Sequence, residues 1–205
     1  MECRLDDRQC WEKSECPPAD FACLTLQSQP QLFEYALGKE NRRHAELLHP
    51  ILKACSDEVA GDRNRFADCL LDMADLFDEI PGFVSSVPGV QSLHQAAAKA
   101  EKAGPKKAYG GRVAEQRYGP FPSPPCEPKD YACVAYHYGE LHRHAVGTED
   151  CYDEQCSKKG FRPAWIMWPA LKACGEEAGG DKSKFFSCLK GISSLLRSIA
   201  QQMRA

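Results

Sequence analysis

Cysteine is the residue type in this sequence best suited to chemistry, with 12 copies among 205 residues. Thiolates can act as nucleophiles, bind metal ions or pair as disulfides. No C-x-x-C pair occurs, so thiol-exchange catalysis lacks a resolving cysteine at the usual spacing. A high and even count is typical of a disulfide framework formed in an oxidising compartment. We predict disulfides, and no free thiol, for Cys3, Cys10, Cys16, Cys23, Cys55, Cys69, Cys126, Cys133, Cys151, Cys156, Cys174 and Cys188.

Metal binding is the alternative use of these residues. The first four cysteines could supply four thiolates to Zn²⁺, but their six-residue gaps are wider than those of zinc knuckles, so disulfides are favoured. The histidine cluster of His137, His142 and His144 offers no pair at a spacing of four. We interpret these histidines as surface or packing residues and predict no metal site.

Composition and motifs also argue against an enzyme. No phospholipase-type motif, nucleophile elbow, phosphate-binding loop or dinucleotide fingerprint is present, so we predict neither catalytic residues nor a cofactor. The formal net charge of −3 gives no overall attraction to nucleic acid or to anionic membranes. The most apolar window, residues 164–173, is too short to span a bilayer and contains Pro169. We expect no transmembrane segment, and at most a peripheral association with a membrane complex.

An internal repeat organises the chain. The segment PILKACSDEVAGDRNRFADCL, residues 50–70, matches PALKACGEEAGGDKSKFFSCL, residues 169–189, at 11 of 21 positions. A second match relates CPPADFAC, residues 16–23, to CEPKDYAC, residues 126–133. Self-similarity in the same order predicts two copies of one structural unit.

Each long repeat contains the corner of a helical hairpin. Gly61-Asp62 and Gly180-Asp181 read as a helix stop followed by the N-cap of the next helix. Apolar residues recur at helical spacing on both sides of each corner. Folding the chain there brings together cysteines that would stand about 21 Å apart on one continuous helix. We predict two disulfides, Cys55–Cys69 and Cys174–Cys188.

The remaining cysteines are harder to pair. On a helix, residues seven apart stand about 10.5 Å from each other, too far for a disulfide. Nested pairing across a short hairpin avoids this distance, although six cysteines allow 15 pairings. The predicted nested pairs are Cys3–Cys23, Cys10–Cys16, Cys126–Cys156 and Cys133–Cys151.

These elements predict an all-α fold of two tandem disulfide-stapled helical-hairpin units, residues 1–80 and 126–205. A Pro/Gly-rich linker, residues 81–125, joins them. Its residues 91–103 could form a short helix, and its basic stretch, residues 99–117, fits a solvated spacer better than a strap for phosphates or acidic surfaces. We expect proteolysis to begin within residues 106–117.

Two tryptophans distinguish the second unit. Trp165 and Trp168 precede Pro169, and the first unit has His49 in the place of Trp168. Packing in the core accounts for such residues in most proteins. Two tryptophans in one turn cannot both face a small core, however, so we predict that Trp165 and Trp168 form a partner-binding surface.

Antiparallel helices joined by nested cysteine pairs resemble the coiled-coil-helix-coiled-coil-helix (CHCH) proteins of the mitochondrial intermembrane space. The resemblance is one of architecture, because that family's usual nine-residue spacing is replaced here by six, thirteen or four. The spacing C-x6-C-x5-C at residues 3–16 also resembles the opening of the extracellular helical repeats in the GDNF receptor α and GAS1 family.

The CHCH resemblance implies a non-catalytic accessory subunit, bound to other protein subunits of a large intermembrane-space-facing assembly such as a respiratory-chain complex. Met1 is followed by neither a signal peptide nor a transit peptide, which fits that compartment if Met1 is the native start. If Met1 begins a mature fragment instead, a secreted disulfide-rich helical binding protein is the better interpretation.

Overall fold

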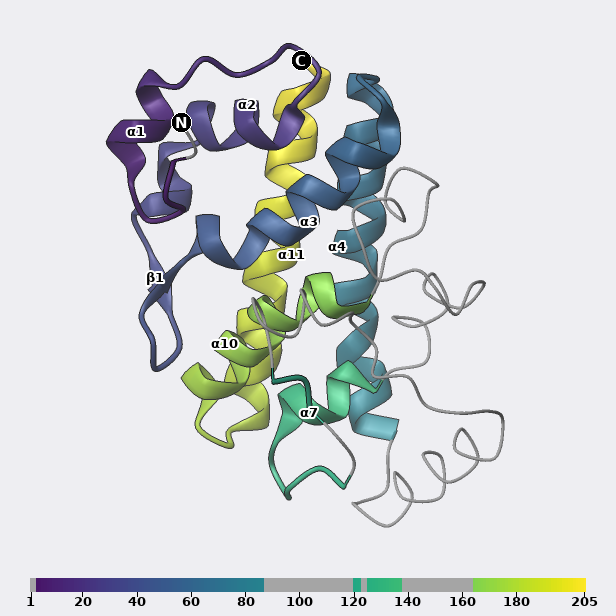
Figure 1. Ribbon diagram of the computed structural model, residues 1–205. Coiled ribbons are helices and arrows are strands. Elements are labelled where there is room, and N and C mark those ends of the chain that lie inside the picture. The colour runs from purple at the N-terminus through teal and green to yellow at the C-terminus, as the bar shows by residue number, and fades with distance from the viewer. Residues whose placement is uncertain (1–2, 87–119, 123–124, 138–163) are drawn as a thin grey trace.

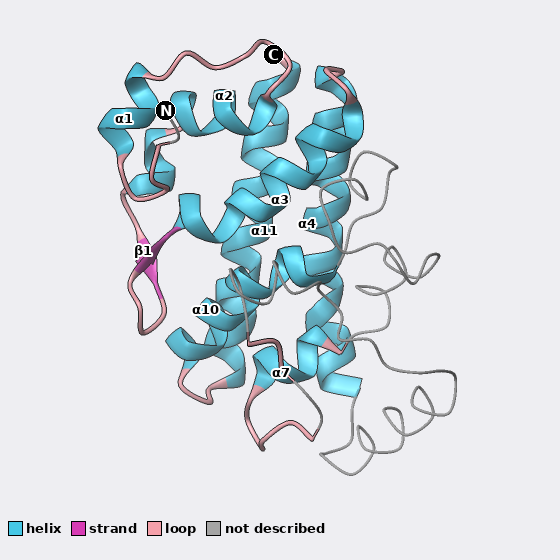
Figure 2. Ribbon diagram, viewed as in Figure 1, coloured by secondary structure: helices cyan, strands magenta, loops and turns pink. Residues whose placement is uncertain are grey.

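A computed structural model describes residues 3–86, 120–122, 125–137 and 164–205. This part of the chain is mostly helical, with a single two-stranded hairpin as its β-structure (Figure 2). Within these residues, no helix combines the length and apolarity needed to cross a membrane. The all-α prediction is confirmed.

The first half contains four α-helices. They are α1 (Arg8–Lys13), α2 (Phe21–Ser28), α3 (His44–Val59) and α4 (Arg63–Ser86). Between α2 and α3 lie the 3₁₀ helix η1 (Pro30–Phe33) and the antiparallel strands β1 (Ala36–Leu37) and β2 (Arg42–Arg43). Helix α4 continues through Pro81, and Val84 in its last turn is buried. The predicted linker therefore begins as helix, because the apolar stripe of α4 extends past the proline.

The described part of the second half repeats this order in shorter form. It contains α7 (Tyr131–Tyr136), the 3₁₀ helix η2 (Ala164–Met167), α10 (Trp168–Ala178) and α11 (Lys182–Arg204). The expected helix at residues 91–103, the predicted cleavage region at residues 106–117, and residues Cys151 and Cys156 lie outside the described residues.

Helices α4 and α11 form the centre of the molecule. They lie side by side, with α3 and α10 packed across them (Figure 1). Their directions are antiparallel, because Arg204 near the end of α11 pairs with Asp68 near the start of α4. Further along, Arg197 bonds Asp75 and Asp78, both at 2.6 Å, and these bonds raise the pKa of its guanidinium, with Asp78 contributing most.

The two halves share one hydrophobic core. Fully buried side chains of α4 and α11 belong to the same cluster: Phe66, Leu70, Phe77, Phe185, Leu189 and Leu196. The predicted arrangement of two separate stapled units is therefore not shown. Helices of 24 and 23 residues each carry an apolar stripe too long for one short hairpin to cover, and pairing the stripes buries both.

The hairpin corners fold as their sequences predict. Asp62 and Asp181 accept hydrogen bonds from the backbone amides of Arg65 and Lys184, which are otherwise unsatisfied at the start of a helix. The preceding residues enter the left-handed region in both halves. In the first half this residue is Ala60, with φ 49°, where the second half has Gly179.

The comparison of the two corners predicts a stabilising substitution. The left-handed conformation costs a residue with a Cβ about 1–2 kcal/mol, which glycine avoids. Part of that gain is lost, because glycine has greater freedom in the unfolded chain. We expect Ala60→Gly to raise the free energy of unfolding by about 0.5–1 kcal/mol in a urea titration. The converse change, Gly179→Ala, should lower it. Destabilisation by Ala60→Gly would contradict this account of the corner.

Candidate functional site

Two of the predicted disulfides are confirmed. Cys55–Cys69 links α3 to α4, and Cys174–Cys188 links α10 to α11. Their Cα atoms stand 5.7 and 5.5 Å apart, within the usual range for a disulfide. The described residues contain no free cysteine. Each bridge joins the two arms of one hairpin, and none of the bridges in the described residues links the two halves.

The nested pairing is wrong. Its place is taken by bridges between cysteines seven residues apart in sequence: Cys3–Cys10, Cys16–Cys23 and Cys126–Cys133. The prediction assumed that both members of such a pair lie on one helix. In each pair the first cysteine instead precedes the helix, and a turn folds it back to a Cα–Cα distance of 5.5 to 5.7 Å.

The same local structure builds all three bridges. An aspartate four residues after the first cysteine caps a helix and accepts a hydrogen bond of 3.0 Å from the amide of the second cysteine. The amide of that aspartate closes the turn by donating to a carbonyl three residues back. The pattern is C-x3-D-x2-C, and its aspartates are Asp7, Asp20 and Asp130. Two of these blocks, residues 16–23 and 126–133, are recognisable as a repeat, whereas residues 3–10 share with them only the two cysteines and the aspartate.

The predicted partner-binding tryptophans lie differently from one another. Trp168 is buried, with 6% of its surface exposed, and its ring meets Tyr136 edge-on at 5.3 Å. Trp165 is half-buried against the same core. Packing therefore accounts for Trp168, while a partner-binding role for the pair stays a prediction that the geometry does not test.

A groove of about 930 Å³ lies between the β-hairpin region and α11. Its apolar lining comes from Leu37, Ile192 and Leu195, and serines of α11 lie beside them. Tyr35 stands at this groove with 64% of its surface exposed, which no other large apolar side chain in the described residues matches. Clefts of this size with apolar walls and a few polar groups are typical of binding sites. No sequence pattern pointed to Tyr35.

Contacts across the two halves hold one wall of this groove. The backbone amides of Gly38 and Lys39 donate to the carboxylates of Glu177 and Glu176 on α10, at 3.2 and 2.9 Å. Gly38 has φ 76°, and a Cβ there would stand 2.7 Å from the Glu176 carboxylate and 3.1 Å from the Cα of Ala173. Glycine is therefore required at this turn.

Electrostatics at the groove are mixed. Burial lowers the pKa of the His44 imidazole below its ordinary value and so favours the neutral ring. Its ring centroid lies 6.2 Å from that of Tyr35. Glu177, Asp181 and Lys184 also line the groove. The groove lining therefore carries both acidic and basic groups.

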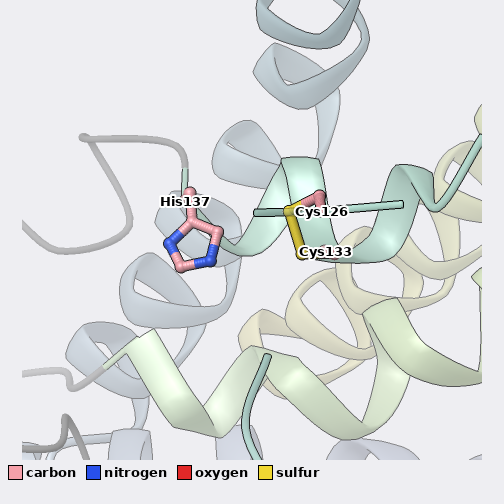
Figure 3. Close-up of side chains that lie close together, drawn as sticks. All are labelled: Cys126, Cys133 and His137. Carbon is pink, nitrogen blue, oxygen red and sulfur yellow. A yellow bond between two sulfur atoms is a disulfide. The ribbon is translucent and has the colours of Figure 1, made fainter. Parts of the chain in front are cut away.

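A second group of side chains lies around α7, with Cys126 before the helix, Cys133 in it and His137 as its C-cap. Cys126 Sγ, Cys133 Sγ and a ring nitrogen of His137 all lie within 4.8 Å of one another (Figure 3). Both cysteines are buried, with 3% of their surfaces exposed, and His137 is half-buried. In the oxidised protein the two sulfurs are bonded to each other, so they offer no thiolate to a metal ion. The sequence places His137 near Cys133, but helical spacing alone does not show that the turn before α7 brings Cys126 to them.

No protein-family model, curated protein or solved structure matches this chain. The structure shows a helical protein with several disulfide-stapled helices, and no family or homologue is identified.

Proposed function

We propose that this protein is a non-catalytic structural component that binds other proteins in an oxidising compartment. Ten paired cysteines support an oxidising compartment. Disulfides persist in such compartments and are rare in reducing ones, where cysteines are kept as free thiols.

The observation that carries the proposal is the groove beside Tyr35. Exposed tyrosines combine a large apolar ring with a hydroxyl group that can hydrogen-bond, and they are enriched at protein interfaces. The side chains of Leu37 and Leu195 continue the apolar surface from the ring. A partner segment that places an apolar side chain in the groove would cover this surface and could bond the neighbouring serines and Glu177.

The first specific setting is an accessory subunit of a large intermembrane-space-facing assembly, such as a respiratory-chain complex. Helical hairpins stapled by Cys55–Cys69 and Cys174–Cys188 support it. The local pairing of Cys16 with Cys23 weakens it, because the resemblance to CHCH proteins depended on nested pairs.

The second setting is a secreted disulfide-rich helical binding protein. It is favoured by the three C-x3-D-x2-C bridges, each of which closes a short loop at the start of one helix. Small secreted domains that cannot build a sufficient hydrophobic core are typically rich in disulfides.

Cell fractionation combined with native electrophoresis tests both settings. In cells of the source organism, we expect the tagged full-length chain to migrate with a large assembly and to become protease-sensitive only when the outer mitochondrial membrane is ruptured. Recovery from the culture medium would select the secreted setting. A chain found reduced and monomeric in the cytosol would contradict the proposal.

A pair of variants then tests the groove. We expect Tyr35→Ala to release the protein from its partner while leaving the melting temperature unchanged, because the side chain is exposed. Arg63→Ala, at an exposed position on α4, is the matched control and should remain bound. Equal binding by both variants would show that the partner occupies another surface.

A further inference from the structure

The group formed by Cys126, Cys133 and His137 has the composition of a metal site. Two thiolates and an imidazole are the ligands that Zn²⁺ prefers in proteins. Their donor atoms already lie within 4.8 Å of one another, and the two cysteine Cα atoms stand 5.6 Å apart. Small side-chain movements would therefore bring the three donor atoms around one metal ion.

The local fold fixes the three side chains. Asp130 caps α7 by accepting from the Cys133 amide, which holds Cys133 in the first turn of the helix. His137, the C-cap of α7, follows Cys133 by four residues and so lies about one turn further along the same side. The turn closed by the amide of Asp130 and the carbonyl of Glu127 returns Cys126 to the same place.

We propose that, when the Cys126–Cys133 disulfide is reduced, the two thiolates and His137 bind one Zn²⁺ ion, with water as the fourth ligand. The inference is independent of the proposed binding function. It assigns two states to one site, a disulfide in an oxidising compartment and a zinc site in the newly made or reduced chain.

A dithiol can reduce the Cys126–Cys133 disulfide. It transfers two electrons and two protons to the S–S bond and is itself oxidised to a disulfide. The S–S bond breaks, and each sulfur becomes a thiol. Zn²⁺ then displaces the two thiol protons to solvent and binds the resulting thiolates together with the imidazole.

The first half of the chain supplies an internal comparison. The equivalent bridge, Cys16–Cys23, has the same spacing and the same cap, but Gln27 occupies the position of His137. The side-chain amide of Gln27 donates to the Ser14 carbonyl at 2.7 Å. An amide is a poor zinc ligand compared with imidazole, so this half should lack the site.

Alkylation of the reduced full-length chain tests the proposal. The protein is reduced with a phosphine, equilibrated with or without Zn²⁺, and treated with a thiol reagent, and the rate at each cysteine is followed by peptide mass spectrometry. We expect Zn²⁺ to slow alkylation of Cys126 and Cys133 at least about tenfold, because a thiolate bound to the metal is less available as a nucleophile. Cys16 and Cys23 should be much less protected.

Two reciprocal variants make the test specific. His137→Gln should abolish the extra protection of Cys126 and Cys133, and Gln27→His should confer protection on Cys16 and Cys23. Co²⁺ added to the same samples should give thiolate charge-transfer absorption that decreases in the first variant and increases in the second. Zinc protection that is unchanged by His137→Gln would overturn the proposal, whether or not the reduced chain keeps its helices.

Discussion

Trp168→Ala is expected to lower the free energy of unfolding by about 3–5 kcal/mol, the usual cost of removing a buried tryptophan. The ring is 6% exposed and contacts Tyr136 edge-on, in the same core cluster as Ile166 and Leu171. Deleting it leaves a cavity that the surrounding helices cannot fill without moving. Chemical denaturation followed by circular dichroism measures the change.

A conservative variant controls for the cavity. Trp168→Phe keeps most of the ring volume and removes a buried indole N–H that has no hydrogen-bond partner among the described residues. Its cost should therefore stay below about 1.5 kcal/mol.

The interface hypothesis predicts the opposite pattern for Trp168→Ala, with an unchanged melting temperature and binding weakened by more than about 1 kcal/mol. That result would mean that Trp168 faces a partner.

Removal of the Cys55–Cys69 bridge is expected to lower the free energy of unfolding by about 3 kcal/mol. The bridge joins cysteines 14 residues apart and restricts the unfolded chain, and removing it restores the entropy of that loop. The double variant Cys55→Ala/Cys69→Ala avoids a free thiol. Cys174→Ala/Cys188→Ala is the matched control, with the same 14-residue separation in the second half. Thermal unfolding of the two variants measures both effects.

The shape of the transition carries further information. Because one core includes side chains from both halves, we expect each double variant to show a single unfolding transition shifted as a whole. Two tandem units with separate cores would behave differently. They would give two transitions, of which each double variant shifts only one. Such a result would restore the original prediction of independent units.

Part of the fold could be predicted because its signals are local. The corners at Gly61-Asp62 and Gly180-Asp181 combine helix-ending and helix-starting residues, and their position places Cys55 opposite Cys69. Helical spacing of apolar residues likewise predicted the two long arms. In each case the sequence within about twenty residues determines the geometry.

The nested disulfides failed for a physical reason. Helical geometry separates cysteines seven apart, but it applies only if both lie within the helix. Asp7 and Asp20 mark helix starts that lie between the paired cysteines, and this signal was available in the sequence. The third copy, Asp130, makes the pattern recognisable.

The shared core and the groove could not be predicted in this way. Self-similarity shows that two segments adopt similar structures, but it does not show whether they pack against each other. The pairing of Arg197 with Asp75 and Asp78 joins residues more than a hundred positions apart, and no local pattern marks such a contact. Tyr35 is noteworthy only because the folded surface leaves it exposed.

The distribution of the bridges has a consequence for a chain cut between residues 86 and 120. Every disulfide in the described residues closes within one half, while the core is formed by both. A nicked molecule would thus become a two-chain complex held by noncovalent contacts only, above all those between α4 and α11. The connection contributes effective concentration, which cutting removes. The nicked pair would separate on dilution, leaving α4 and α11 with exposed apolar faces.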